Sequence, residues 1–155
     1  MQDPLLTIKP QFARMAIDML PQILIIENQS YSMGWSAQLF IDCINKNYLC
    51  QVIKLDDVIA GYSIVQKIVD EHHILNICVA PNFLNKGLGR YQLKDIIKRA
   101  ESAAMNRILL EVRASSKIAR KLYMSAGFHI IGKRKGYYPH PDGREDAHVM
   151  ELALS

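Results

Sequence analysis

Apolar and polar positions change their period several times along the chain, and each change marks a new secondary-structure element. Residues 73–79 (HILNICV) are apolar almost throughout, which is typical of a strand buried on both faces, and we expect this strand at the centre of a sheet. From Gly87 onward, apolar residues recur at helical spacing with Lys and Arg on the opposite side, which predicts a helix. After it we expect a strand over 107–112, a helix over 116–128 that Gly127 terminates, and closing strands over 129–138 and 146–152.

Shorter patterns occupy the first half of the chain. Residues 11–16 are predicted to form a short strand, and Asp18 is expected to cap the helix that follows. Ser36 is the predicted cap of a second, short helix. Residues 48–55 and 58–69 are rich in Val, Ile and Tyr and are separated by two aspartates, so we expect an antiparallel hairpin or meander there.

The predicted order of elements is β-α-α-β-β-β-α-β-α-β-β, in which strands alternate with helices only in the second half of the chain. This order predicts an α/β fold with a mixed sheet. A chain of 155 residues is long enough for one domain with a sizeable core. We therefore expect a single domain over 1–155, of which 1–10 form a short N-terminal extension.

Composition narrows the class of protein. Half of the residues are apolar and 22% are charged, which is typical of a soluble globular protein. No apolar run approaches the roughly 20 residues that cross a bilayer, and the first residues lack the pattern of a secretory signal, so we expect a cytoplasmic protein without a membrane partner. The three cysteines form no Cys-x-x-Cys pair and have no His at metal-ligand spacing, so we expect reduced thiols and no metal. The net charge of +4 suits an anionic partner but does not identify one, and we expect no direct nucleic-acid binding.

A glycine-rich loop, residues 85–90 (NKGLGR), joins the central strand to the next helix. The first turn of a helix has free backbone N–H groups and a partial positive charge, and glycines let an anion come close to those groups. The loop matches neither the P-loop nor the dinucleotide-binding pattern. Taken alone, it is either an anion-binding loop or an ordinary strand-to-helix turn.

The wider set of motifs resembles the GNAT acetyltransferases from about Phe12 onward. The basic G-x-G loop is followed by LLEVRAS (109–115), KLYMSAGF (121–128) and YYPHPDGREDAHVMEL (137–152). Within that superfamily the tail is most similar to the bacterial ribosomal-protein-alanine N-acetyltransferases. Residues 26–36 (IENQSYSMGWS) are similar to that group's I-E-x-x-x-x-x-P-W-S, with Gly34 in place of the proline.

The resemblance implies a GNAT fold of about seven strands with helices on both faces, and acetyl-CoA as the anionic co-substrate. It assigns the pyrophosphate to the loop residues Asn85, Lys86, Gly87, Leu88, Gly89 and Arg90, and the pantetheine arm to the backbone of Ile77, Cys78 and Val79. Leu84-Asn85 replaces an arginine that the family usually has. Ser116, also assigned to the cofactor, stands where the family commonly has Asn, and we expect it to cap the helix that follows.

Acetyl transfer to an amine needs a proton acceptor for the amine and a proton donor for the departing thiolate. By resemblance, Glu111 is the general base and Tyr123 the general acid. From residue type alone, Glu111 is equally a partner of Arg113 or another surface base, and Tyr123 a core residue.

The segment 136–146 (GYYPHPDGRED) is expected to be a loop with its turn at Asp142-Gly143. Tyr137 and Tyr138 offer flat, partly polar walls for a peptide, and Glu145 or Asp146 could meet a basic side chain. By pattern alone these tyrosines could equally pack on the sheet. The resemblance favours substrate recognition, with Glu27 and Trp35 completing the peptide groove.

The resemblance implies an enzyme that transfers acetyl from acetyl-CoA directly, in a ternary complex, to a protein N-terminal α-amine. The implied partner is a ribosomal protein, with the N-terminal alanine of a small-subunit protein as acceptor. Two alternatives stay open: acetylation of lysine, polyamine, antibiotic or other small amines on the same fold, and a CoA-binding module without catalysis.

Overall fold

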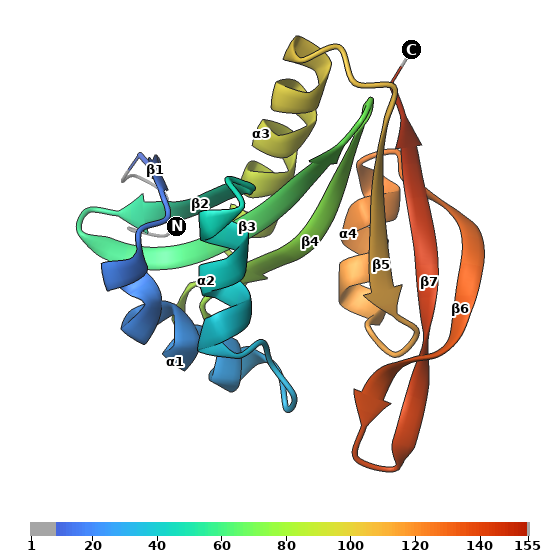
Figure 1. Ribbon diagram of the computed structural model, residues 1–155, viewed down its shortest axis with the longest axis horizontal. Coiled ribbons are helices and arrows are strands. Elements are labelled where there is room, and N and C mark those ends of the chain that lie inside the picture. The colour runs from blue at the N-terminus through green and yellow to red at the C-terminus, as the bar shows by residue number, and fades with distance from the viewer. Residues whose placement is uncertain (1–8, 155) are drawn as a thin grey trace. The chain divides into compact units, whose positions relative to one another are not determined.

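The computed structural model describes residues 9–154, so the predicted extension over 1–10 lies, up to residue 8, outside the described residues. Figure 1 shows the elements in chain order. The strands are β1 (Gln11–Arg14), β2 (Leu49–Leu55), β3 (Val58–Ile68), β4 (Glu71–Val79), β5 (Arg107–Arg113), β6 (His129–His140) and β7 (Gly143–Ala153). The α-helices are α1 (Leu20–Ser30), α2 (Ala37–Asn45), α3 (Leu88–Ser102) and α4 (Lys117–Ser125), and short 3-10 turns η2 (Ile17–Met19) and η3 (Pro81–Phe83) precede α1 and follow β4.

The seven strands form one sheet in the order β1-β2-β3-β4-β5-β7-β6, so β4 is its central strand. β4 and β5 are parallel, whereas β1-β2, β2-β3, β5-β7 and β6-β7 are antiparallel. The predicted element order and the mixed sheet are therefore confirmed.

The chain divides into two compact units. The first contains the residues up to Val65 together with Asn76–Gln92, and the second contains Gln66–Leu75 and the chain from Leu93 onward. β3 and β4 each contribute residues to both units. The expectation of a single domain stays a prediction.

One apolar cluster of the first unit lies between the sheet and the start of α3. Ile53, Leu55 and Ala60 pack with Leu88, the first residue of α3. Phe12 of β1 covers this cluster, and its ring lies 5.5 Å from that of Tyr91. The loop that precedes α3 is thus held to the sheet by apolar burial on its helical side.

Two helix caps were predicted in the first unit, and one of them is confirmed. Ser36 caps α2 as predicted, because its hydroxyl accepts from the backbone N–H of Leu39 at 3.2 Å. The prediction that Asp18 caps α1 is wrong, since Asp18 lies inside η2 and the cap residue is Met19, without a side-chain hydrogen bond. The extra 3-10 turn moves the start of α1 along the chain.

Burial alternates along β4, which corrects the expectation of a strand buried on both faces. His72, Ile74, Asn76 and Cys78 are buried, and the residues between them are partly exposed. Leu75, Ile77 and Val79 are therefore partly exposed although they are apolar. Two polar side chains, His72 and Asn76, lie on the buried face.

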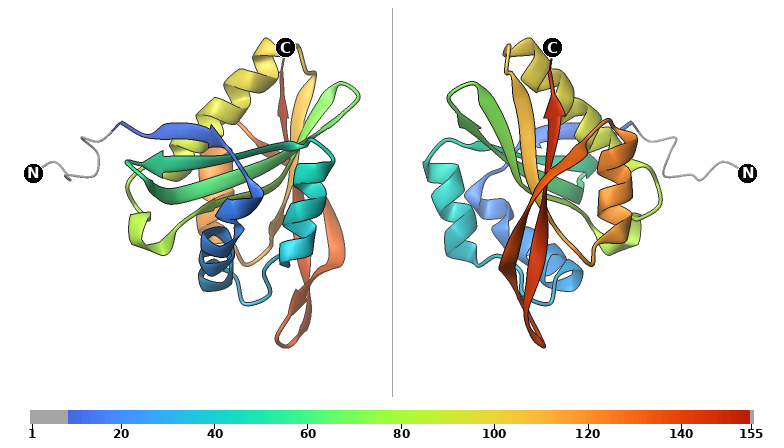
Figure 2. Two further views of the ribbon diagram at one scale, coloured as in Figure 1. Left: turned by 60° about the vertical axis from the view of Figure 1, so that its left-hand side comes forward. Right: turned by 90° about the vertical axis from the view of Figure 1, so that its right-hand side faces the viewer.

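The second unit ends in a long hairpin. β6 and β7 pair from His129 to His140 with two register shifts, and Figure 2 shows the two strands crossing in a strongly twisted ribbon. The predicted loop over 136–146 is wrong, because both strands continue to a turn of two residues, Pro141 and Asp142. Gly143 has φ +124°, and this left-handed conformation lets the chain reverse so tightly.

Val69 is the strained position of the turn between β3 and β4. It has φ +54° and its side chain is 85% exposed. A β-branched residue is costly in this conformation, which Asn adopts easily. We expect Val69→Asn to stabilise the protein by about 1 kcal/mol, seen as a rise in Tm of about 2–4 °C in thermal unfolding.

Val58→Asn is the control, since Val58 is also an exposed valine beside a two-residue turn, but it is the first residue of β3 and its φ is not positive. It should give no rise in Tm. An equal or larger rise in the control would show that polarity, not backbone strain, causes the effect.

Candidate functional site

The backbone of β4 changes partners along its length. β5 pairs with β4 from Glu71 to Ile74, whereas β4 continues to Val79. The carbonyl of Cys78 points toward β3, because a Cβ on Gly61 would lie 2.5 Å from its oxygen. Backbone groups of successive residues in a strand point to opposite sides. Ile77 and Val79 therefore direct theirs away from β3, to the side on which a further extended chain could pair.

Three contacts hold this part of β4 in place within the first unit. The backbone N–H of Ala80 donates to the carbonyl of Ala60 at 2.8 Å. The side-chain amide of Gln92, which is fully buried, donates to the carbonyl of Cys78 at 3.0 Å, and the hydroxyl of Tyr31 donates to the carbonyl of Ile77 at 3.4 Å. Gly61 is required here because any side chain would displace β4 or Gln92.

The loop after β4 has the conformation expected of an anion-binding turn. Asn85 and Gly87 have φ +63° and +82°, and space is open around Gly87 where a Cβ would stand. The N–H of Tyr91 makes the first helical bond, to the carbonyl of Gly87 at 3.0 Å. The N–H groups of Leu88, Gly89 and Arg90 precede this bond and have no partner within the helix. Lys86 and Arg90 add positive charge to the same turn.

Glu27 lies in α1, and only 1% of it is exposed. Its carboxylate accepts three hydrogen bonds: from the hydroxyl of Tyr62 at 2.6 Å, the side-chain amide of Asn76 at 3.1 Å and the backbone N–H of Trp35 at 2.9 Å. Glu27 and Trp35, predicted together as substrate-binding residues, are thus brought together. Their role in acceptor binding stays a prediction, and the burial of Glu27 favours an indirect one.

Glu111 and Tyr123 both belong to the second unit. Glu111 lies in β5, and its carboxylate is 3.4 Å from Nε of Arg134 on β6, whose guanidinium lies 5.1 Å from the ring of Tyr137. Tyr123 is buried in α4 with its ring 5.9 Å from that of Phe128. The basic partner that residue type suggested for Glu111, Arg113, pairs elsewhere.

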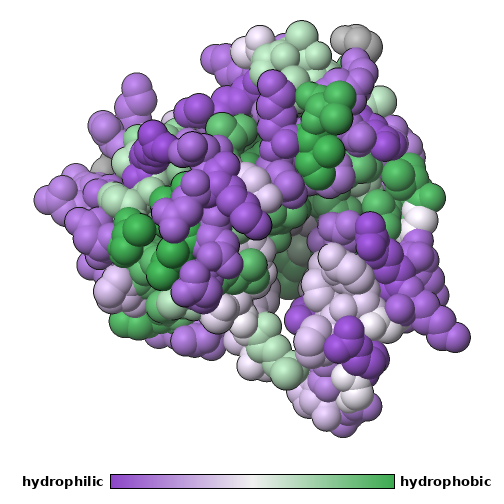
Figure 3. All heavy atoms as spheres, viewed as in Figure 1, coloured by the Kyte–Doolittle hydropathy of each residue, from purple (hydrophilic) through white to green (hydrophobic). Residues whose placement is uncertain are grey.

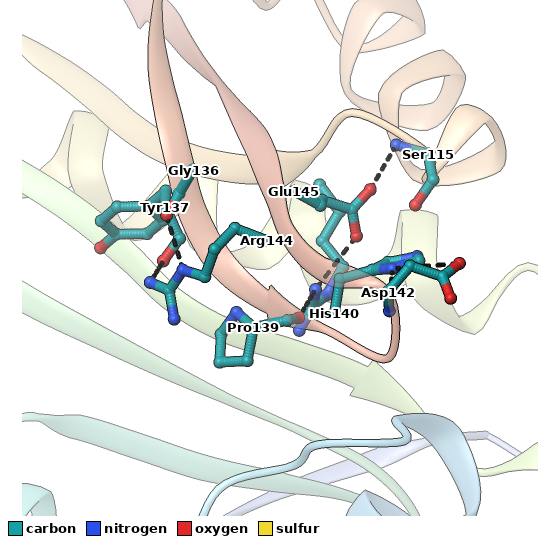
Figure 4. Close-up of polar contacts among 9 residues, drawn as sticks. Ser115, Gly136, Tyr137, Pro139, His140, Asp142, Arg144 and Glu145 are labelled. Carbon is teal, nitrogen blue, oxygen red and sulfur yellow. Dashed lines mark hydrogen bonds and ion pairs between the residues drawn. The ribbon is translucent and has the colours of Figure 1, made fainter.

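Arg113 holds the hairpin tip to the end of β5. Its guanidinium donates to the carbonyl of Pro139 at 2.9 Å and to Glu145 at 3.0 Å, and it lies 4.4 Å from the ring centre of Tyr138. Figure 4 shows the other oxygen of Glu145 directed to the backbone N–H of Ser115, 3.0 Å away. Glu145 therefore meets a basic side chain of its own chain.

The two tyrosines of the tip differ in environment. Tyr137 is 41% exposed and Tyr138 is half-buried, with the rings 4.9 Å apart and nearly perpendicular. Burial, with a smaller effect from the negative charge of Glu111, raises the pKa of Tyr138 to about 12. In Figure 4 the side chain of Arg144 reaches the carbonyls of Gly136 and Tyr137, at 2.9 and 3.0 Å. Figure 3 shows the tip coloured purple to near white, so its surface is hydrophilic to neutral.

Ser116 is the cap residue of α4 by position, but its side chain makes no capping hydrogen bond, so that part of the prediction is wrong. Sequence reasoning also missed the partners that fix the site residues: Tyr62, Asn76, Gln92, Arg113 and Arg134. The available signal was a polar residue within an apolar run, as at Asn76 in HILNICV. Among residues 9–154 there is no group of three or more His, Cys, Asp or Glu side chains placed to hold a metal, and no helix long and apolar enough to cross a membrane.

Comparison with known proteins gives consistent matches. The model of the acetyltransferase (GNAT) family matches residues 18–128. A protein of Salmonella typhimurium named ribosomal protein bS18-alanine N-acetyltransferase is 38% identical over 136 residues, which are 88% of this chain and 92% of that protein. The crystal structure of the Escherichia coli ribosomal-protein-S18-alanine N-acetyltransferase has a TM-score of 0.88 and 34% identity, covering 95% of each chain. Arabidopsis thaliana Naa50 in complex with the bisubstrate analogue CoA-Ac-MVNAL has the same fold, with a TM-score of 0.81, 19% identity and coverage of 94% of this chain and 99% of that one.

The hairpin tip should be sensitive to acid. Hydrogen bonds from Ser115, with a contribution from Arg113, hold the pKa of Glu145 below its usual 4.5. A lowered pKa in the folded state stabilises the protein above pH 4.5, and this stabilisation is lost as the pH falls through the folded pKa. In urea unfolding, the stability lost by Glu145→Gln should thus be greatest near neutral pH and shrink below pH 4.5.

Glu101→Gln serves as the control, because Glu101 is exposed on α3 and makes no such bonds among the described residues. Its difference from the wild type should not change with pH. A pH-independent loss in Glu145→Gln would mean that the ionised form of Glu145 is not what stabilises the tip.

Proposed function

Because the chain belongs to the acetyltransferase (GNAT) family, we propose that it transfers the acetyl group of acetyl-CoA to a protein N-terminal α-amine, that of the N-terminal alanine of ribosomal protein bS18. The proposal rests on one observation, the arrangement of backbone groups along β4 and in the loop after it. Ile77 and Val79 offer backbone groups on the side away from β3, and the turn at Gly87 offers helix N–H groups for phosphate. Together they suit a long ligand with an amide-containing arm and a pyrophosphate.

We propose that backbone groups make most of the contacts to the acetyl donor. Ile77 and Val79 pair with the pantetheine arm through their backbone groups. The carbonyl of Cys78 accepts a hydrogen bond from Gln92, so Cys78 contributes only by holding its two neighbours in place. Asn85 to Arg90 hold the pyrophosphate, mainly through amides. Because amides supply most of these contacts, the missing arginine at Leu84-Asn85 weakens binding without abolishing it. Ser116 is proposed as a cofactor contact, and its hydroxyl makes no capping bond that would compete.

In the proposed reaction, the neutral α-amine attacks the thioester carbonyl, a C–N bond forms and the C–S bond breaks. Glu111 receives the proton that the amine loses, directly or through one water, and Tyr123 gives a proton to the thiolate of CoA. The ion pair of Glu111 with Arg134 is partly exposed, with 22% and 55% of the two side chains accessible, and such pairs contribute little free energy. The carboxylate can therefore exchange this partner for the acceptor amine.

The acceptor is proposed to be a protein chain end rather than a nucleic acid, and a ribosomal acceptor implies that the reaction takes place in the cytoplasm. Tyr137 and Tyr138 are proposed to contact the first residues of the acceptor. Their rings are fixed by Arg134 and Arg113 from the side of β5 and β6, so they are held in place before the acceptor binds.

A competition assay tests the proposed function. Purified protein and acetyl-CoA are incubated with a bS18 N-terminal peptide beginning with alanine, a lysine peptide with a blocked N-terminus, and spermidine, and mass shifts are read. We expect acetylation of the alanine peptide at its α-amine. Modification confined to lysine or spermidine would replace the acceptor, and acetyl-CoA binding without any transfer would indicate a binding module.

Replacing the proposed acid and base should affect turnover more than binding. Tyr123→Phe and Glu111→Gln should each lower kcat by about 10²- to 10⁴-fold, the usual loss when acid-base help is removed, while the Kd for acetyl-CoA changes little. Tyr48→Phe is the control for loss of a hydroxyl in another part of the chain and should keep full turnover. Full turnover in Tyr123→Phe would remove Tyr123 from the mechanism.

Gly87→Ala should weaken donor binding, because the left-handed backbone is unfavourable for alanine and the new methyl group occupies the open space proposed for the pyrophosphate. We expect the Kd for acetyl-CoA, measured by calorimetry, to rise about tenfold or more, equal to about 1.4 kcal/mol. Gly143 also has a positive φ, +124°, and open space around it, so Gly143→Ala controls for backbone strain and should leave this Kd unchanged. Equal Kd values for both variants and the wild type would exclude the Gly87 turn from donor binding.

A further inference from the structure

The buried carboxylate of Glu27 joins three parts of the first unit. Its partners are Tyr62 on β3, Asn76 on β4 and the backbone of Trp35, next to the start of α2. All three donors are neutral. A buried carboxylate without a cationic partner is costly unless hydrogen bonds replace its water, and here both oxygens have donors. The bond to Trp35 is the one that reaches out of the sheet, into the loop between α1 and α2.

This loop, residues 31–36, is fastened at both ends. At its start the hydroxyl of Tyr31 donates to the carbonyl of Ile77, and near its end Trp35 donates to Glu27. Between them Gly34 packs so closely on Glu27 that a Cβ would lie 2.7 Å from its Cγ. The conformation of the loop is therefore dictated by the side chain of Glu27, not only by one hydrogen bond.

We propose that Glu27 is a positioning residue: its buried carboxylate fixes the loop 31–36 against β3 and β4 and thereby sets the KM for the acceptor peptide, without touching the acceptor itself. This inference rests on the proposed function. Ile77, to which the loop is tied, lies on the segment of β4 that is proposed to hold the acetyl donor, so the loop borders the place where an acceptor must approach. Met33, at the middle of the loop, is 53% exposed and available for contact.

Gly34→Ala is the sharpest test, because it moves the loop without removing any of the polar groups that bind Glu27. Cγ of Glu27 is buried and cannot give way without losing its three hydrogen bonds, so the loop must shift. Gly132→Ala is the matched control, since Gly132 has open space and no left-handed φ. Glu27→Met is the second variant: it keeps a similar side-chain length but removes both acceptor oxygens, so the Trp35 N–H loses its partner. Asp57→Asn, at an exposed turn, controls for loss of a carboxylate.

Two readouts separate positioning from simple destabilisation. We expect Gly34→Ala and Glu27→Met to raise the KM for the alanine peptide about tenfold, with kcat and the Kd for acetyl-CoA within about twofold of the wild type. Trp35 is the single tryptophan of the chain, and its ring lies 5.1 Å from that of Phe40, so its emission reports on the loop directly. In both variants the emission should shift to longer wavelength and be quenched more by acrylamide, and in both controls neither should change.

A lower Tm with an unchanged peptide KM would overturn the proposal, because Glu27 would then be structural only. Unchanged Trp35 emission in both variants would also overturn it, because the loop would not depend on Glu27. Failure of the proposed function is distinguishable: the wild type would then leave the alanine peptide unmodified, and the emission measurements would still decide whether Glu27 fixes the loop.

Discussion

The proposed donor site depends on how the backbone hydrogen bonds of β4 are distributed. A strand inside a sheet uses its N–H and C=O groups on both sides, and a buried group left without a partner is costly. β4 pairs with β5 over four residues and then continues for five more, so its second half has to be held from the side of β3. Gly61 and Gln92 hold this half of the strand. Because Gly61 has no side chain, the carbonyl of Cys78 can lie close to β3, where the amide of Gln92 donates to it.

The polar residues buried in the first unit follow from the same requirement. Asn76 and Gln92 are buried, and each donates a side-chain hydrogen bond, Asn76 to the carboxylate of Glu27 and Gln92 to the carbonyl of Cys78. Polar groups in a low-dielectric interior fix geometry, since their partners must lie at defined distances and angles. The resulting precision extends from β4 through Glu27 into the loop that begins at Tyr31. A purely apolar core could supply the same stability but would not specify the position of that loop.

Much of the fold could be predicted because its signals are local. Hydrophobic periodicity gave the order of all the elements, and the Ser36 cap depends on bonds within one turn. Where the outcome depends on tertiary structure, prediction was wrong: an apolar run does not show which face of β4 is covered, and β6 continues past its predicted end at Tyr138 because Arg113 binds the carbonyl of Pro139 and His140 pairs with Gly143 of β7. The motifs named site residues but not their partners. Glu111 of β5 pairs with Val149 of β7, and Arg134 of β6 pairs with Ala147 of the same strand. Glu111 and Arg134 therefore meet across β7 only because both strand pairings have these registers, and no local sequence pattern encodes two registers at once.

A protein α-amine asks less of the proposed base than a lysine side chain does. At pH 7, removing the proton from a lysine ammonium costs about 4–5 kcal/mol, whereas an α-ammonium costs only about 1 kcal/mol, because their unperturbed pKa values are about 10.4 and about 7.7–8.0. Glu111, the proposed base, is partly exposed and lies beside the guanidinium of Arg134. A carboxylate suits such an acceptor, because part of the amine is already deprotonated and needs a group that receives its proton rather than a strong base. Selectivity for α-amines over lysine side chains would then arise at the chemical step itself.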